Sequence, residues 1–348
     1  MSLYETTREL SGAPLDVSRR LARFARPHRA AIGALASCSP RIAELAETFP
    51  ALLFALATGF GGAEQRRAAL DLIQSGAVLR DAADRVGLPW WLRRLPPETF
   101  LAPLQGLPGS AVFSLRIGNL VPPDAAEASG WLARTLFAYH TAGEAYALWI
   151  ARQKRIPAGA IGEITETLLA SWAWHGLHRD TPAHSLLRTP WFDGIGLRRA
   201  LDEAKAWSMR IDLAVALGAG IEDSWFGSGA CGPYQFIPLT RLEDFLSEAA
   251  AMNNCLDQFA DQVRCGRTRV FSIRKAGRIV ADVEIGPHDD DCSVPRIVQL
   301  RGPRNRRANP EVWQATLTWL AHQEFRPLPR VNEAVDRQRH QQLIRAIW

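Results

Sequence analysis

Hydrophobic residues recur every three or four positions through the first two thirds of the chain, which is the spacing of amphipathic helices. The spacing predicts several short helices before residue 88, and a run of prolines divides the segment that follows into short pieces. Three longer helices are predicted over residues 131–155, 161–179 and 197–217. We therefore expect residues 1–217 to form a helical region.

A change of composition follows this region. Glycine and proline gather between residues 218 and 238, at positions 218, 220, 227, 229, 232, 233 and 238. Such a stretch is typical of a boundary between domains. We therefore assign residues 218–238 to a linker, residues 239–325 to a second domain, and residues 326–348 to a basic C-terminal tail or helix.

The second domain combines both periodicities. A helix is predicted over residues 240–263, where Thr240 and Glu243 have the spacing of a capping box. Strands are predicted over residues 269–274, 279–285 and 296–301 because apolar and polar residues alternate there, and Pro310 opens a last helix. The expected fold class is α+β: a mostly helical N-terminal region, then a helix, a three-stranded antiparallel sheet and a helix.

The alternation also assigns side chains to the two faces of this sheet. One face should pack on helices and carries Phe271, Ile273, Ile279, Ala281, Val283, Ile285, Val298 and Leu300. The other face receives Arg274, Asp282, Glu284, Gln299 and Arg301. That polar face has two open interpretations, a solvated face of a one-sided sheet or a platform that a ligand covers. Glu284 should be ionised there, since a neighbouring arginine favours the charged carboxylate.

The charge of the chain favours polyanionic partners. The 348 residues include 41 basic and 36 acidic side chains, a net charge of +5, and only three of the basic residues are lysines. Arginines are densest at residues 301–307, where guanidinium groups could bind phosphates through paired hydrogen bonds. Nucleic acid is therefore the expected partner.

The sequence gives little support for disulfide, metal, cofactor or membrane chemistry. The five cysteines have no C-x-x-C pair, which argues against a disulfide framework or a four-cysteine zinc site. The chain has no phosphate-binding loop, dinucleotide fingerprint or G-x-S-x-G motif, so we expect no cofactor and no metal. It also has no secretory signal and no long apolar stretch, so we expect no membrane partner and a cytoplasmic location.

Two stretches of the second domain follow a wider pattern, "LEDFLSEAAAMNNCLDQFADQVRCGRTRVFSIRKAGRIVADVEI" and "IVQLRGPRNRRANPEVWQATLTWL". The segment 236–320 resembles the PcfJ-like domain family, named for a protein of conjugative-plasmid transfer regions. The resemblance rests on Glu248, Asn254, Cys255, Leu256, Phe259, Gly266, Arg274, Glu284, Gln299, Gly302 and Asn305. The chain departs from the family at Asn254, where histidine is common, at Phe259, where tyrosine is common, and at Asp282, where threonine is common.

The resemblance implies a cytoplasmic accessory protein of mobile-element or DNA-processing type. We expect it to bind nucleic acid through Arg274, Arg301, Arg304, Arg306 and Arg307. An enzyme of unknown reaction is the alternative, with candidate catalytic residues Cys255, Glu284, Gln299 and Asn305. A third interpretation is a protein-interaction scaffold that uses the helical region to bind a protein partner. Whether the chain is an enzyme therefore stays open.

Cys255 and one segment of the helical region have two interpretations each. Cys255 lies beside an apolar stripe, which favours a buried structural cysteine over a nucleophile. Residues 82–94 loosely resemble a helix-turn-helix, with Pro89 where the recognition helix would begin. Packing within a helical bundle is the favoured interpretation of that segment.

Overall fold

The chain folds into a mixed helical and β-sheet protein. The structure is a computed structural model that describes residues 18–122, 124–153, 165–288, 290–291 and 293–324. It divides into two compact units, Met1–Leu177 with Trp191–Leu197, and His178–Pro190 with Arg198–Trp348. The tail predicted over residues 326–348 lies outside the described residues. An α+β fold class is confirmed, although the sheet is larger than predicted.

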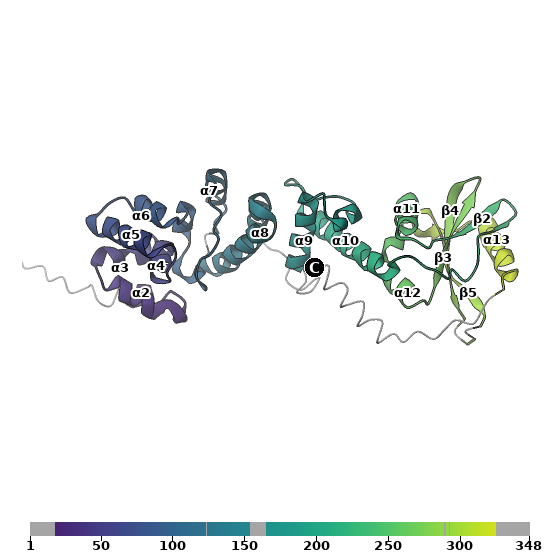
Figure 1. Cartoon of the computed structure of the whole chain (residues 1–348), viewed down its shortest axis with the longest axis horizontal. Coiled ribbons are helices and arrows are strands. Elements are labelled where there is room, and N and C mark those ends of the chain that lie inside the picture. The colour runs from purple at the N-terminus through teal and green to yellow at the C-terminus, as the bar shows by residue number, and fades with distance from the viewer. Residues whose placement is uncertain (1–17, 123, 154–164, 289, 292, 325–348) are drawn as a thin grey trace, which may run out of the picture. The chain divides into compact units, whose positions relative to one another are not determined.

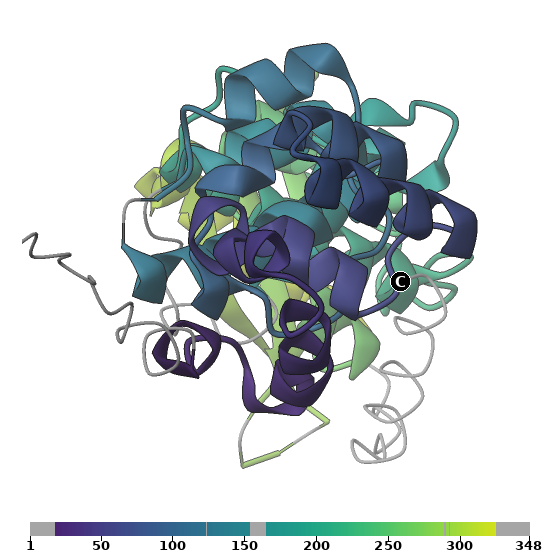
Figure 2. The same ribbon diagram turned by 90° about the vertical axis from the view of Figure 1, so that its left-hand side faces the viewer.

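The first unit is helical (Figure 1). Its helices are α2 (Arg29–Ala36), α3 (Pro40–Thr48), α4 (Pro50–Ala57), α5 (Ala63–Ser75), α6 (Leu79–Val86), α7 (Ala111–Ile117), α8 (Ala125–Ala151) and α9 (Thr165–Leu177), with 3₁₀ turns η1 (Arg26–His28), η2 (Trp90–Arg94) and η3 (Pro97–Thr99). Figure 2 views these short helices, in purple and blue, as they run in different directions. Helix α4 is apolar all round and contacts α2, α3 and η2, so it forms the core of the unit's first half.

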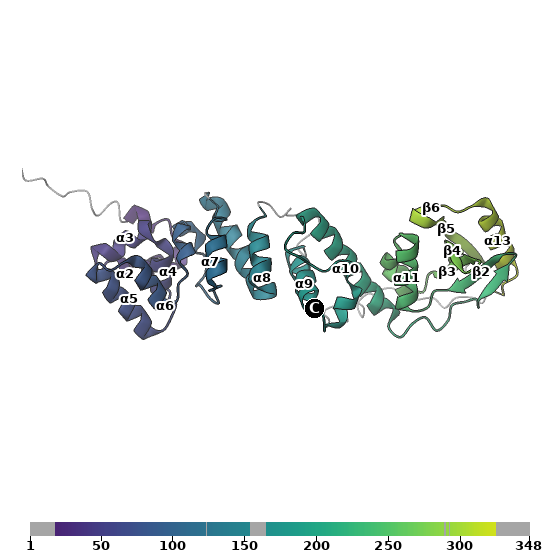
Figure 3. The ribbon, with the colours of Figure 1, turned by 90° about the horizontal axis from the view of Figure 1, so that it is seen from above.

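The second unit begins with η4 (Pro182–Leu186) and helix α10 (Leu197–Leu217), which matches the predicted helix 197–217. An antiparallel sheet follows with strands in chain order: β1 (Gly229–Cys231), β2 (Tyr234–Pro238), β3 (Arg269–Lys275), β4 (Arg278–Pro287), β5 (Pro295–Gly302) and β6 (Arg306–Arg307). The remaining elements are α11 (Leu242–Met252), η5 (Leu256–Gln258), α12 (Ala260–Arg264), η6 (Pro303–Asn305) and α13 (Pro310–Ala321). Figure 3 shows α11 and α13 on opposite sides of the sheet.

The sheet has six strands, so the prediction of three strands is wrong. Strands β1 and β2 lie within residues 218–238, where composition predicted a linker. The glycines serve the hairpin: Gly232 has φ 55° in the turn, and a Cβ at Gly229 would stand 2.5 Å from the Nε1 atom of Trp319. Phe236 on β2 is fully buried in the sheet core. Glycine and proline therefore mark a close-packed hairpin here.

The helix predicted over residues 240–263 is interrupted. Helix α11 ends at Asn253, which adopts φ 49° in the left-handed region that asparagine tolerates better than most residues. The chain resumes as the short elements η5 and α12. At the start of α11 the predicted Thr240–Glu243 box is replaced by Asp244, whose Oδ2 accepts from the backbone nitrogens of Arg241 at 2.9 Å and Thr240 at 3.1 Å.

The face that packs on α13 is apolar, as the alternation predicts. Its core holds Phe226, Tyr234, Phe236, Phe271, Ile273, Ala281, Val283, Ile285, Leu300, Ala308, Val312, Ala315 and Trp319. Ile279 and Val298 were assigned to this face wrongly, because the register shifts at two irregularities. At the first irregularity Arg274, on the polar face, pairs with Ile279. At the second, Ile297 packs on the apolar core while Val298 is 44% exposed.

Candidate functional site

The polar face of the sheet lies beneath the chain's own helices. Residues of α10, α11, η5 and α12 form a second apolar cluster with Val270 of β3 on this side. Ser272, Asp282 and Glu284 of the sheet are buried, together with Glu248 of α11. The centre of this face is therefore neither a solvated surface nor an open platform for a ligand. The expectation of a one-sided sheet is wrong because the interrupted helix folds over it.

A pair of carboxyl groups is buried at the centre of this face. Asp282 is 5% exposed and Glu248 is 1% exposed. Burial, a hydrogen bond with Glu248 and the negative charge of Glu248 together raise the pKa of Asp282 to about 9, although the Asn254 amide, which donates to Asp282 Oδ2, lowers it. Asp282 is therefore protonated at neutral pH. One shared proton also accounts for Glu248 Oε1 and Asp282 Oδ1, which have no other hydrogen-bond partner among the described residues.

Arg274 lies beside Glu248 of this pair rather than beside Glu284. Its Nη2 atom lies 3.9 Å from Glu248 Oε2, and its Nε donates to the Ser272 hydroxyl at 3.2 Å. Burial raises the pKa of Glu284, while the neighbouring side chains of Thr268 and Gln299 oppose that rise. The expectation that Arg274 keeps Glu284 ionised is thus wrong, since Glu284 pairs with Val270, four residues along β3 from Arg274.

The four residues proposed as catalytic candidates line one small pocket. Its lining consists of Asn254, Cys255, Leu256, Phe259, Val270, Asp282, Glu284, Gln299, Arg301 and Asn305. The enclosed volume of about 20 Å³ is enough for a single water molecule. The structure therefore brings Cys255, Glu284, Gln299 and Asn305 together, and it adds Asp282, which the sequence placed on the polar face without a chemical role.

Cys255 reaches this pocket because the last residue of α11, Met252, lies three residues before it. Its side chain belongs to an exposed residue, so the interpretation as a buried structural cysteine is wrong. The Asn305 amide donates to Cys255 Sγ at 3.8 Å. No histidine lines the pocket. Its polar groups are thus a thiol, three amides, a guanidinium and two carboxyl groups whose pKa values are raised.

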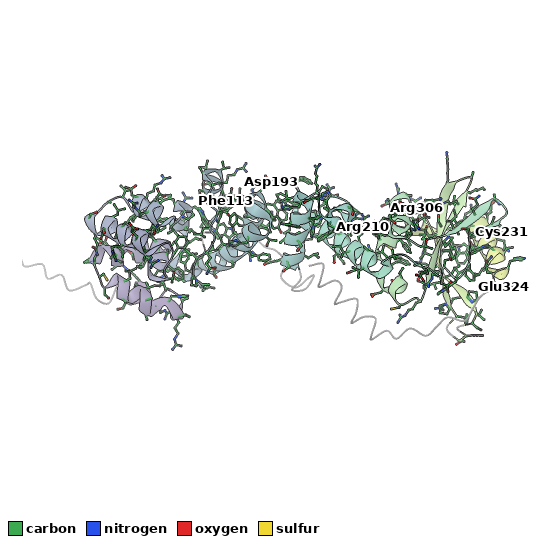
Figure 4. The ribbon with its side chains drawn as sticks, in the orientation of Figure 1. Phe113, Asp193, Arg210, Cys231, Arg306 and Glu324 are labelled. Carbon is green, nitrogen blue, oxygen red and sulfur yellow. The ribbon has the colours of Figure 1, made fainter. Side chains whose placement is uncertain are left out.

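The five predicted arginines lie in three places, the first being the position of Arg274 beside Glu248. Arg301 lines the small pocket, while Arg304, Arg306 and Arg307 line a separate groove of about 570 Å³ beside the end of α11. We call this groove, with Asn253 and Asn309 on its walls, the arginine groove. Figure 4 shows Arg306 on the α11 side of the sheet, away from Cys231 at the opposite side.

The backbone of this loop is held in an unusual conformation. Arg304 and Asn305 have φ 59° and 56°, both in the left-handed region. Strand β6 pairs with β5 through Arg301 with Arg307 and Gly302 with Arg306. After Ala308, which is buried, Asn309 Oδ1 accepts from the Glu311 backbone nitrogen at 3.0 Å and caps α13. The three groove arginines therefore extend from a loop fixed at both ends.

Comparison with known proteins identifies this part of the chain. Residues 226–317 match the PcfJ-like protein family. The match begins just before β1 and runs into α13, so the PcfJ-like segment contains the whole sheet, α11, the pocket and the arginine groove. It covers about a quarter of the chain. No curated protein and no solved structure shows significant similarity to the chain.

The described residues hold neither a membrane-spanning helix nor a group of metal ligands. None of the described helices has the length and apolar character needed to cross a membrane. Within the same part of the chain, no three histidine, cysteine, aspartate or glutamate side chains are grouped as metal ligands.

Proposed function

We propose that this protein binds nucleic acid through the arginine groove, as an accessory protein of mobile-element or DNA-processing type. The observation that carries the proposal is the groove itself, with three exposed arginines on its walls. None of the three forms an ion pair within the described residues. Their guanidinium groups are therefore available for phosphate oxygens. The PcfJ-like match supports the association with conjugation and mobile elements.

The polar face of the sheet is not part of this proposal. Glu248, Asp282 and Glu284 are buried beneath α11 and its neighbours, and they add carboxyl groups that phosphates avoid. The fixed loop favours binding because arginines that are already positioned lose less conformational freedom when a ligand arrives. We therefore assign phosphate contacts to Arg304, Arg306 and Arg307, with Arg301 at the mouth of the neighbouring pocket.

Fluorescence anisotropy with labelled DNA and RNA oligonucleotides tests the proposal. The triple variant Arg304→Gln, Arg306→Gln, Arg307→Gln should lose at least about tenfold in affinity at low salt, since each phosphate contact contributes. Its dependence of log affinity on log salt should also flatten, by about 0.9 per lost contact with duplex DNA.

A matched control removes three exposed arginines from the same unit outside the groove. The variant Arg198→Gln, Arg199→Gln, Arg278→Gln loses the same charge. If both triple variants bind equally well, the groove makes no specific contact and the proposal is wrong.

An enzyme with its site in the small pocket is the second candidate. The observation in its favour is a protonated carboxyl group, Asp282, in the same pocket as the exposed thiol of Cys255. A carboxyl group with a raised pKa can act as a general acid, and a thiol can act as a nucleophile. If Cys255 is a nucleophile, its thiol should react faster with iodoacetamide than the thiol of Cys38, which is exposed in the helical unit. Equal rates measured by mass spectrometry would contradict this candidate.

A further inference from the structure

The helical unit contains a groove of its own. It has a volume of about 1010 Å³ and is lined by residues of α6, η2 and α7 and the loops beside them. Its walls carry three arginines, Arg80, Arg93 and Arg94, and one carboxylate, Asp84. Trp90 and Leu115 supply aromatic and apolar surface, and Leu115 is 76% exposed. We call it the tryptophan groove.

The arginines of this groove are held in place. The Cζ atom of Arg93 lies 4.9 Å from the centre of the Trp90 ring, and that of Arg80 lies 6.0 Å from it. Arg93 Nε donates to the Thr48 carbonyl at 3.0 Å. Arg94 Nη1 donates to the Gly118 carbonyl at 2.6 Å. Each arginine retains further N–H groups on an exposed side chain, so the groove presents oriented donors for an anion.

This groove occupies the segment that resembles a helix-turn-helix in sequence. Helix α6 ends at Gly87 with φ 72°, which supplies the turn. The element that follows is η2, a 3₁₀ helix of five residues, where a recognition helix would be needed. At a rise of about 2 Å per residue it is roughly 10 Å long, and its residues Trp91 and Leu92 are buried. Reading of a major groove by an inserted helix is therefore not supported.

We propose that the tryptophan groove binds single-stranded nucleic acid. Its three arginines match a phosphate backbone, and Trp90 and Leu115 offer surface to unstacked bases. Duplex DNA or RNA keeps its bases stacked inside the helix and could not use that surface. The site is distinct from the arginine groove, since it lies in the other unit and shares no residue with it.

Arg80 gives the sharpest test. It is exposed on α6 and makes no hydrogen bond to the protein within the described residues, so Arg80→Gln should leave the fold intact. Arg85 is equally exposed on the same helix but does not line the groove, so Arg85→Gln is the matched control. We expect Arg80→Gln to weaken binding of labelled oligothymidylate by about fivefold, and Trp90→Leu by about tenfold, while Arg85→Gln has almost no effect. Thermal melting followed by circular dichroism checks that each variant is folded.

The measurements use the full-length chain that also carries the triple substitution in the arginine groove. In this background the arginine groove contributes little to the signal, and any remainder is the same in every variant compared, so the two proposals succeed or fail separately. Equal affinities for Arg80→Gln and Arg85→Gln would overturn the tryptophan-groove proposal. Competition by duplex DNA or by poly-glutamate as strong as that by unlabelled oligothymidylate would also overturn it, the latter in favour of an acidic protein partner. Preferential competition by the single strand supports it.

Discussion

The two faces of the C-terminal sheet are built on opposite principles. Toward α13 the sheet buries aromatic and aliphatic side chains, and Trp319 stacks on Phe236 with ring centres 4.3 Å apart. Toward α11 it buries Ser272, Asp282 and Glu284, of which Asp282 meets Glu248 and Ser272 accepts a hydrogen bond from Arg274. The first face stabilises the fold through apolar burial. The second face satisfies its polar groups through hydrogen bonds and a shared proton. Burying these groups opposes stability, and it keeps acidic groups beside the pocket.

The largest expected effect is on the apolar face. Trp319→Ala should lower the free energy of unfolding by about 3–5 kcal/mol, since a buried indole that contacts three aromatic rings is removed. Urea denaturation followed by circular dichroism measures the change. Trp313 lies on the same helix but is 38% exposed, so Trp313→Ala should cost far less. Equal losses would mean that α13 does not pack as described.

On the polar face, removing a single donor should cost less. Asn254→Ala deletes the amide that donates to Asp282 Oδ2 and leaves that buried oxygen without a partner. The expected loss is about 1–3 kcal/mol in the free energy of unfolding, again from urea denaturation. In an Asp282→Ala background the same substitution should cost almost nothing. If its cost is unchanged there, the two side chains are not coupled.

The shared proton predicts a particular dependence of stability on pH. Because the folded pKa of Asp282 is raised to about 9, the folded state keeps a proton that the unfolded state releases near pH 4. This group therefore lowers stability progressively as the pH rises from about 4 to about 9. Asp282→Asn should remove that slope and be more stable than the wild type at pH 8, by about 1 kcal/mol or more. If the free energies of unfolding of the two proteins, measured by urea denaturation, change with pH in parallel, Asp282 is not protonated in the folded state.

The smallest effect is expected at Glu284. Burial raises the pKa of this carboxyl group, and an amide of the same shape can keep contacts with Thr268 and Gln299. Glu284→Gln should therefore change the free energy of unfolding by less than about 1 kcal/mol. Its neighbour Val283 is fully buried on the apolar face, so Val283→Gln should cost several times more, since it buries an amide without partners. Equal costs in urea denaturation would abolish the difference between the faces.

The periodicity of the sequence determined those helices and strands that have a single apolar face and bury it in a single environment. The α10 boundaries and, apart from Ile279 and Val298, the inward side chains of the central strands followed directly, because a helix or a strand with one apolar face has a single way to bury it. The residues of the pocket were also recognisable, since the PcfJ-like pattern places Cys255, Glu284, Gln299 and Asn305 in one segment.

Only the tertiary structure decided where the chain departs from regular periodicity. The left-handed turn at Asn253 and the two sheet irregularities each move neighbouring side chains, and no local pattern marks them. The turn folds η5 and α12 over the sheet, and this burial converts Asp282 from a surface carboxylate into a protonated acid. A pKa depends on everything that surrounds the group in space. Sequence separation hides those neighbours, since Glu248 and Asp282 are brought together from a helix and a strand.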